Sequence, residues 1–455
     1  MIEQYKEYKE TPALWIDRIP SSWESKMVKE IFLERRTKVS DKDFAALSVS
    51  KAGIVPQLET AVKTDNGDNR KLVKKGDFVI NSRSDRKGSS GISPYDGSVS
   101  LINIVLQPTS NENRGFLHYL LRSIPFTEEF YRNGRGLVSD LWTTRYSELK
   151  NIFLPIPPKD QQEKIVRFLD WKTSQMNHYV KDKKQEIQKL KELKISTINR
   201  AVSMGIRRNT VLQKNGSSWL GDIPAHWKML PSKRLFYLRK DKALPTDEQL
   251  TASQKYGVVP QQWFMEQEGR RVTVVFTGED ILKHVEKGDF VISMRSFQGG
   301  IEYSKFTGKI SSAYVMLIPD HDYVYDRYFR WLLKSSAYIK ALRATSDLVR
   351  DGQALRYANF AKIDLPVVPM EEQIEIADYL DRFCEDVDQA ISNIRNEISL
   401  VQELKLRTVA DVVTGKVNVS DVEIPEYKSE ASDIEDISED EESRDEETID
   451  EEVDE

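Results

Sequence analysis

The chain contains two copies of one long module. The segment Trp15–Trp23 (Trp-Ile-Asp-Arg-Ile-Pro-Ser-Ser-Trp) returns 204 residues later as Trp219–Trp227. Val73–Ile80 returns 212 residues later, and the Leu-Pro-Ile-Pro-Pro segment that begins at Leu154 returns 211 residues later as Leu-Pro-Val-Val-Pro. Solenoid repeats have periods of roughly 20–50 residues, so this much longer period indicates a duplicated domain. A duplicated domain suits a target that has two parts.

Each copy is predicted to form a mixed α/β globule followed by a long helix. Short apolar runs such as 78–80 and 313–318, punctuated by Gly, Asn and Ser, are typical of strands and turns. Proline clusters at 155–158 and 366–369 end the globules, because proline neither continues a strand ladder nor sits inside a helix. The predicted fold class is α+β, with globular domains at 1–159 and 206–370, long helices at 160–205 and 371–416, and a disordered acidic tail at 426–455.

The two charged, proline-free stretches that follow the globules carry a heptad pattern. Eight of ten seam positions are apolar in the second stretch, and six of ten in the first. Such seams pack against a partner helix. The predicted helix-pairing residues are Leu169, Met176, Val180, Ile187 and Leu190 in the first stretch, and Leu380, Val387, Ile391, Ile394, Ile398 and Val401 in the second.

The simplest partner for each seam is the other seam. Helices of roughly 35–40 residues would form a coiled coil about 55 Å long. An antiparallel pair would place one globule at each end, as a ruler does, whereas a parallel pair would leave both globules at one end. The alternative is that each helix packs on its own globule.

Composition indicates a basic body with an acidic tail. Residues 426–455 hold 17 acidic and two basic residues, a net charge of −15, so the remaining 425 residues carry about +9 of the overall −6. That asymmetry points to a body that binds nucleic acid. The tail either keeps the protein soluble, or competes with DNA for the basic surface or docks a basic partner. A single cysteine and the lack of a long apolar run favour a cytoplasmic protein without membrane association.

Sequence signatures of catalysis are missing. The chain has no phosphate-binding Gly-x-x-x-x-Gly-Lys-Ser/Thr loop, no dinucleotide-binding glycine turn and no methyltransferase Asn/Asp-Pro-Pro-Tyr/Phe tetrapeptide. Its five histidines and one cysteine do not show zinc-site spacing, so no metal site is predicted. We therefore expect a binding subunit rather than an enzyme.

The first candidate DNA-reading segment follows the repeated Gly-Asp-Phe-Val-Ile strand. An arginine occurs at the same place in both copies, and arginine makes the commonest specific base contact, to guanine in the major groove. The alternative is a solvated loop in which Arg83 pairs with Asp85. The predicted DNA-binding residues here are Asn81, Arg83, Ser84, Arg86 and Lys87 in the first copy and Arg295, Ser296 and Gln298 in the second.

A second candidate lies just before each proline cluster. Arg145 and Arg356 stand 211 residues apart, and each is followed by a tyrosine. Both are predicted to contact DNA, although packing of the tyrosine on the arginine stem is an equal alternative. The repeated tryptophan pairs that flank Ile-Pro are interpreted as scaffold.

Together these motifs resemble the specificity subunits of type I restriction–modification enzymes. The resemblance rests on the doubled Ile-Pro-x-x-Trp, Gly-Asp-Phe-Val-Ile and Leu-Pro-x-x-Pro…Gln motifs, on Asp140–Tyr146 and Asp351–Tyr357, and on Thr414-Gly415-Lys416-Val417. It covers about residues 11–420. It implies two target-recognition domains, each reading one half of a split duplex DNA site, separated by antiparallel helices that set the spacer.

The resemblance also implies partners. The helices would dock two copies of an adenine methyltransferase (modification) subunit, and a restriction subunit that translocates DNA would complete the complex. S-adenosylmethionine, ATP and magnesium would then belong to those subunits, and none to this chain. Two other functions stay open on the residues alone: a self-contained nuclease or methyltransferase, and an interaction protein that dimerises through its coiled coil.

Overall fold

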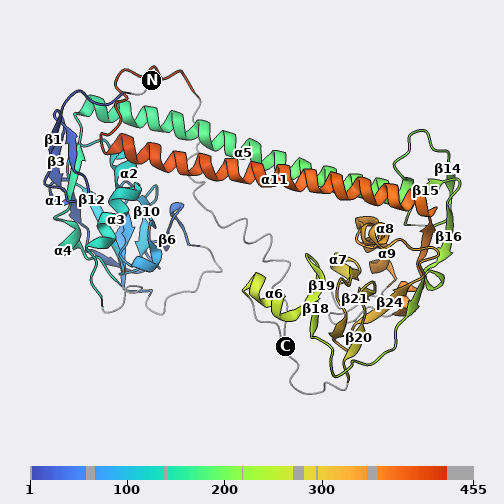
Figure 1. The fold of residues 1–455 in the computed structure, drawn as a ribbon. Coiled ribbons are helices and arrows are strands. Elements are labelled where there is room, and N and C mark those ends of the chain that lie inside the picture. Colours follow the sequence, from blue (N-terminus) through green and yellow to red (C-terminus); the bar gives the residue numbers. More distant parts are fainter. Residues whose placement is uncertain are drawn as a thin grey trace. The chain divides into compact units, whose positions relative to one another are not determined.

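The computed structural model describes residues 3–57, 67–136, 142–217, 219–269, 281–293, 296–345 and 357–427. It forms two compact units: unit 1 comprises Met1–Lys184 and Arg395–Glu455, and unit 2 comprises Gln185–Ile394. The long helices α5 (Lys159–Met204) and α11 (Met370–Val413) each contribute one half to unit 1 and the other half to unit 2 (Figure 1). Of the acidic tail at 426–455, all but residues 426 and 427 lie outside the described part.

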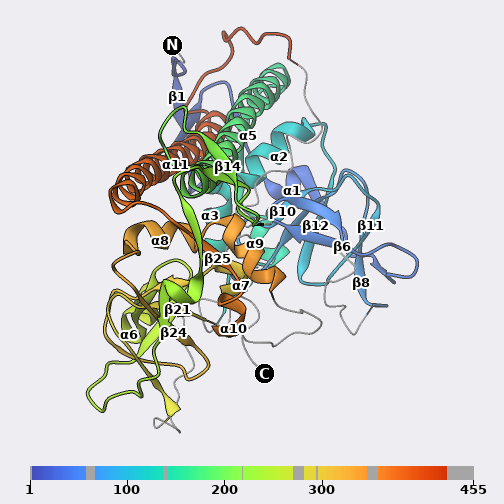
Figure 2. The same cartoon turned by 90° about the vertical axis from the view of Figure 1, so that its right-hand side faces the viewer.

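Unit 1 is built on a four-stranded antiparallel sheet in the order β10-β9-β12-β4. A three-stranded sheet, β11-β8-β5, and the hairpin β6-β7 lie beside it, and α2 packs on β10 (Figure 2). β1 pairs with β2 within the opening segment, and β3 pairs with β13, which joins the opening and closing segments of the globule. The elements are β1 (Tyr8–Glu10), β2 (Arg18–Pro20), β3 (Glu24–Met27), α1 (Val28–Ile31), β4 (Phe32–Glu34), β5 (Lys38–Val39), β6 (Leu47–Ser50), β7 (Gly53–Pro56), β8 (Arg70–Val73), β9 (Phe78–Asn81), η1 (Ser84–Arg86), β10 (Ser90–Ile92), β11 (Gly97–Val99), β12 (Asn103–Pro108), α2 (Arg114–Arg122), α3 (Ile124–Arg132), α4 (Tyr146–Leu149) and β13 (Phe153–Ile156).

Unit 2 repeats this topology with corresponding strand pairings, except that an isolated bridge between Lys242 and Lys283 stands in place of the β5-β8 pair. Its main sheet, β17-β24-β21-β22, corresponds to β4-β12-β9-β10, and the pair β20-β23 and the hairpin β18-β19 correspond to β8-β11 and β6-β7. The duplication seen in the sequence is therefore a duplication of fold. The elements are β14 (Leu212–Lys214), β15 (Asp222–Pro224), β16 (Lys228–Pro231), η3 (Ser232–Arg234), β17 (Phe236–Leu238), β18 (Leu250–Ser253), β19 (Gly257–Pro260), α6 (Gln261–Glu268), β20 (Lys283–Val285), β21 (Phe290–Ile292), α7 (Ser296–Gly299), β22 (Glu302–Tyr303), β23 (Gly308–Ile310), β24 (Val315–Pro319), α8 (Asp326–Leu332), α9 (Ser336–Ala344), α10 (Tyr357–Phe360) and β25 (Asp364–Val367).

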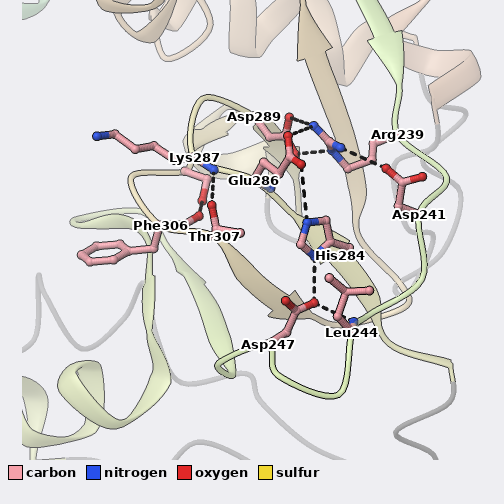
Figure 3. Close-up of polar contacts among 11 residues, drawn as sticks. Arg239, Asp241, Leu244, Asp247, His284, Glu286, Lys287, Asp289, Phe306 and Thr307 are labelled. Atoms are coloured by element: carbon pink, nitrogen blue, oxygen red, sulfur yellow. Dashed lines mark hydrogen bonds and ion pairs between the residues drawn. The ribbon is translucent and has the colours of Figure 1, made fainter.

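The aspartate of each Gly-Asp-Phe-Val-Ile motif has a structural role. In unit 2, Asp289 is buried and accepts hydrogen bonds from Arg239 Nε at 2.7 Å and Nη2 at 3.1 Å, and from the backbone N–H of Glu286 at 2.9 Å (Figure 3). In unit 1, Asp77 accepts the same set of bonds from Arg35 and the Lys74 N–H. The repeated motif therefore fixes the turn into the central strand, because a bidentate arginine and a backbone donor satisfy the buried carboxylate.

Helices α5 and α11 pack together in antiparallel register, as predicted. In unit 1, Lys405 Nζ donates to Asn177 Oδ1 at 2.6 Å, and Tyr179 OH donates to Glu397 at 3.0 Å, so the residue numbers run in opposite directions. In unit 2, Lys194 pairs with Asp388 at 2.6 Å. None of the described helices is both long and apolar enough to cross a membrane. The predicted seam residues Leu169, Met176, Ile187, Leu380, Val387, Ile391, Ile394 and Ile398 are buried, whereas Val180, Leu190 and Val401 are half-buried.

The alternative packing of helix on globule is also present, at the helix ends. The unit 1 core includes Phe168 and Leu169 from α5 together with Val412 and Val413 from α11. The unit 2 core includes Ala201 and Val202 from α5 together with Ile376, Ala377 and Leu380 from α11. Each core therefore needs the beginning of one long helix and the end of the other.

In both units, the repeated Ile-Pro-x-x-Trp motif packs against the end of a long helix. A Cβ added to Gly415, which has φ +77° just after α11, would lie 2.5 Å from Pro20 Cδ and 3.3 Å from the Trp23 ring. Gly205 ends α5 in the same way beside Trp227. Only glycine readily adopts this left-handed helix-end conformation, and here it also lets the buried indole approach the backbone. The interpretation of these tryptophans as scaffold agrees with this burial.

Candidate DNA-recognition surface

The first predicted segment, residues 81–87, leaves the sheet at the end of β9. Asn81 is only 6% exposed, and its side-chain oxygen accepts a hydrogen bond from the Arg83 N–H at 3.0 Å. Tyr131 OH donates to the Asn81 carbonyl at 2.8 Å, and burial raises the pKa of Tyr131 so that the hydroxyl keeps its proton. Asn81 thus supports the loop, and its predicted contact with DNA stays a prediction.

The structure brings the two predicted segments of unit 1 together. Arg83 forms an isolated antiparallel bridge with Thr143, and the Ser84 N–H donates to the Trp142 carbonyl at 3.0 Å. The Thr144 N–H donates to the Ser82 carbonyl at 2.9 Å. Arg145, the N-cap residue of α4, therefore lies two residues along the chain from Thr143, which is bridged to Arg83. No sequence pattern indicates this pairing, since the two segments are about 60 residues apart.

Cationic side chains gather on this surface. Arg83, Arg86, Lys87 and Arg145 are exposed, and the structure records no ion pair between Arg83 and Asp85 among the described residues. Lys87 Nζ lies 2.5 Å from the Glu128 carboxylate, so this lysine is partly neutralised.

Several neighbours of this loop are not among the residues predicted from the sequence. Arg135 is bridged to Thr143 and has a side chain that is 83% exposed, and Trp142 is 38% exposed. An open hollow of about 710 Å³ lies beside the loop and is lined by Ser84, Lys87, Arg132 and Trp142, among others. The sequence signals for these residues are an arginine three residues after the end of a helix rich in aromatics, and a tryptophan in a polar segment.

The equivalent segment of unit 2 differs. Ser296 begins α7, is 1% exposed and accepts a hydrogen bond from the Ser293 N–H at 2.9 Å, so its hydroxyl holds the strand end. Gln298 is exposed. α7 lies against α9 (Figures 1 and 2). The predicted residues Arg295 and Arg356 lie outside the described residues.

The side chains of the unit 1 surface determine its possible chemistry. Guanidinium groups bind phosphates and the acceptor edge of guanine, and an exposed indole stacks on bases or sugars. In the described part of the chain, no three His, Cys, Asp or Glu side chains are grouped so that they could hold a metal ion. The surface is suited to binding DNA.

Comparisons with known proteins agree with this geometry. The family model for the type I restriction modification DNA specificity domain matches residues 20–189 and 224–400. Two specificity subunits of Methanocaldococcus jannaschii are similar: the putative MjaX subunit is 21% identical over 92% of this chain and 99% of its own length, and the MjaVIII subunit is 22% identical over 93% and 99%.

Solved structures share the fold. A chain from a study of complex assembly and conformational transition of the type I restriction–modification system has a TM-score of 0.62 at 15% identity, covering 87% of this chain and 99% of that one. The HsdS subunit of Thermoanaerobacter tengcongensis has a TM-score of 0.51 at 16% identity, covering 89% and 99%. Because the family model matches both copies of the module, the chain belongs to the type I restriction–modification DNA specificity family and is a non-catalytic specificity subunit with two target-recognition domains.

Proposed function

We propose that each unit reads one half of a bipartite, asymmetric duplex DNA site. The observation that carries the proposal is that equal scaffolds present unequal loops. Strands β9 and β21 have the same pairings, but the first leads into η1 with exposed Arg83, Arg86 and Lys87, and the second leads into α7 with exposed Gln298. Different side chains on equivalent frames would read different bases.

The long helices have a separate proposed role. Their antiparallel pairing sets the length of the spacer between the half-sites, and their outer faces dock two copies of a modification subunit. The support is the repeated fold: two equivalent units offer two equivalent docking sites. In type I systems the cofactors belong to the modification and restriction subunits, and we assign S-adenosylmethionine to the first and ATP with magnesium to the second. The assembled complex, with its restriction subunit, would act in the cytoplasm.

Replacing Arg83 by alanine tests the base-reading role. We expect Arg83→Ala to weaken binding to the specific site by about 1–3 kcal/mol while leaving random duplex binding nearly unchanged, because a bidentate arginine–guanine contact has about that value. Discrimination should relax only in the half-site that unit 1 reads. Binding is measured by fluorescence anisotropy on duplexes in which each half-site is altered separately, after methylome sequencing has identified the target.

The matched control is Arg167→Ala, which removes the same charge from an exposed position on α5 of the same unit. That variant should change both affinities little. If Arg83→Ala weakens specific and random duplexes equally, Arg83 contacts phosphate and the base-reading role is wrong.

A further inference from the structure

Unit 2 contains a hollow of about 550 Å³ between β19, α6, β22 and the end of α8. Aromatic rings form much of its wall, and two of them, Trp263 and Phe306, are 40% and 41% exposed. The Trp263 ring stands edge-to-face on Tyr256 at a centroid distance of 5.1 Å, which fixes its orientation. Tyr303 and Trp331 complete the aromatic lining. Flat apolar walls of this kind accept a flat ligand.

A buried carboxylate also lines this hollow. Glu302 is 1% exposed, and its Oε2 lies 2.6 Å from the Lys334 ammonium. Its Oε1 has no hydrogen-bond donor among the described residues. Burial raises the pKa of Glu302 to about 7, which reflects how poorly the ionised form is satisfied. A buried acceptor without a donor is costly, so a ligand that supplies a donor would gain binding free energy there.

The carboxylate is not part of the repeated framework. Glu302 pairs with Val291 across β21-β22, and the equivalent pair in unit 1 is Gly91 with Val79 across β9-β10. A Cβ added to Gly91 would lie 3.3 Å from Gly53 Cα, so the backbones approach too closely in unit 1 for a large side chain. The frame that both units share therefore does not require Glu302.

Cations lie at the hollow as well. Lys305 is exposed, and Arg330 lies over the Tyr303 ring at 5.4 Å from its centroid. Lys255 also lines the hollow, with its ammonium 3.3 Å from Glu268. Aromatic walls, an acceptor without a donor and cations together match a base, its exocyclic amino group and its phosphate.

We propose that this hollow binds a nucleotide whose base carries an exocyclic amino group: the base stacks on Trp263, the amino group donates to Glu302 Oε1, and the phosphate is held by Lys305 and Arg330. Adenine, cytosine and guanine have such a group, and thymine does not. The nucleotide is either free or part of DNA, as a base turned out of its stack. The proposal goes beyond half-site reading by the loops and does not depend on it.

The first experiment measures binding of dAMP, dCMP and dTMP to the full-length protein by equilibrium dialysis at pH 8. We expect dAMP and dCMP to bind at least tenfold more tightly than dTMP. Trp263→Ala should weaken dAMP binding about 5- to 150-fold, because stacking of a base on an aromatic ring contributes about 1–3 kcal/mol. Glu302→Gln should abolish the preference for the amino bases, since the amide NH₂ can donate a hydrogen bond to a carbonyl oxygen of thymine.

The control variant is Tyr95→Ala, which removes an equally exposed aromatic ring (43%) from unit 1 and should leave nucleotide binding unchanged. Circular dichroism verifies folding. If Glu302→Gln does not fold, the exposed Trp263→Ala variant and the comparison of dAMP with dTMP still test the proposal.

A second experiment distinguishes the two sources. Binding of the full-length protein to duplexes that contain one bulged adenine, one bulged thymine or no bulge is compared. A Glu302-dependent preference for the bulged adenine assigns the hollow to DNA, and selective binding of free dAMP alone assigns it to a free nucleotide. Equal binding of dAMP and dTMP, or binding that neither variant changes, overturns the proposal. Specific-site binding, measured separately with Arg83→Ala, reports on the proposed function independently.

Discussion

The pairing of Asp77 with Arg35 explains why both copies of the module keep the Gly-Asp-Phe-Val-Ile motif. The carboxylate of Asp77 is 3% exposed and is bound by two guanidinium nitrogens of Arg35. Removing one partner leaves the other charge poorly compensated, so we expect Asp77→Ala to lower the free energy of unfolding by about 3–5 kcal/mol. Urea denaturation followed by fluorescence measures the change. Asp68→Ala, which removes a 79% exposed carboxylate near Lys42, should cost clearly less, and equal losses would contradict the argument.

The raised pKa of Glu302 predicts that the stability of the protein depends on pH. Burial raises its pKa from 4.5 to about 7 in the folded protein, against the opposing attraction of Lys334. Between these pH values the unfolded chain has released the proton while the folded chain still holds it, so stability falls as pH rises through this range. At 1.36 kcal/mol per pKa unit, the loss relative to Glu302→Gln reaches up to about 3 kcal/mol. Urea unfolding of both proteins at pH 5, 6, 7 and 8 measures it, and parallel profiles would refute the shift.

At the scale of the element, the ends of the long helices are the constrained points. Gly415 and Gly216 have nearly the same φ, +77° and +72°, but a Cβ at Gly415 would lie 2.5 Å from Pro20, whereas a Cβ at Gly216 would have no neighbour within 4 Å. Gly216→Ala should therefore cost only the left-handed strain of about 1–2 kcal/mol. Gly415→Ala should cost a further 1–3 kcal/mol or so from overpacking. Thermal unfolding compares the two variants. Equal losses of stability would show that the end of α11 shifts to accommodate the added Cβ at no cost in free energy.

The elements also show what the sequence could predict. Doubled motifs indicated the doubled sheet, and a heptad seam indicated the paired helices, because both depend on local patterns repeated in order. The pairing of Arg83 with Thr143 depends on tertiary contacts and left no such pattern. Ser296 reads as an exposed loop serine, yet its hydroxyl is used inside the fold. The hollow beside Glu302 needs α6, which follows β19, and single-sequence patterns do not show what this helix covers.

At the scale of the whole molecule, the chain is divided in a way that its linear order hides. Each unit takes its core from one globule, the beginning of one long helix and the end of the other. Two separate fragments, 1–205 and 206–455, would therefore each lack one helix end of their core. Each long helix contributes to both units. We therefore expect a change in helix length to alter the distance between the two recognition domains and not the fold of either one.

Shortening both helices by one heptad tests their proposed role as a ruler. Deleting Lys184–Leu190 from α5 and Ala390–Asn396 from α11 keeps the seam in register, because seven residues complete one repeat. Each helix loses about 10.5 Å, at 1.5 Å per residue. Since base pairs are about 3.4 Å apart, the spacer should shorten by about three base pairs, with both half-sites unchanged.

Methylome sequencing of cells that carry the altered subunit with its modification subunit measures the spacer directly. Deleting seven residues from the tail, 440–446, is the control and should leave the spacer unchanged. Deleting the heptad from α5 alone should abolish methylation, because the seam residues beyond the deletion would then face the wrong partners. A normal spacer after the double deletion would show that the helices hold the units together without setting the distance between the half-sites.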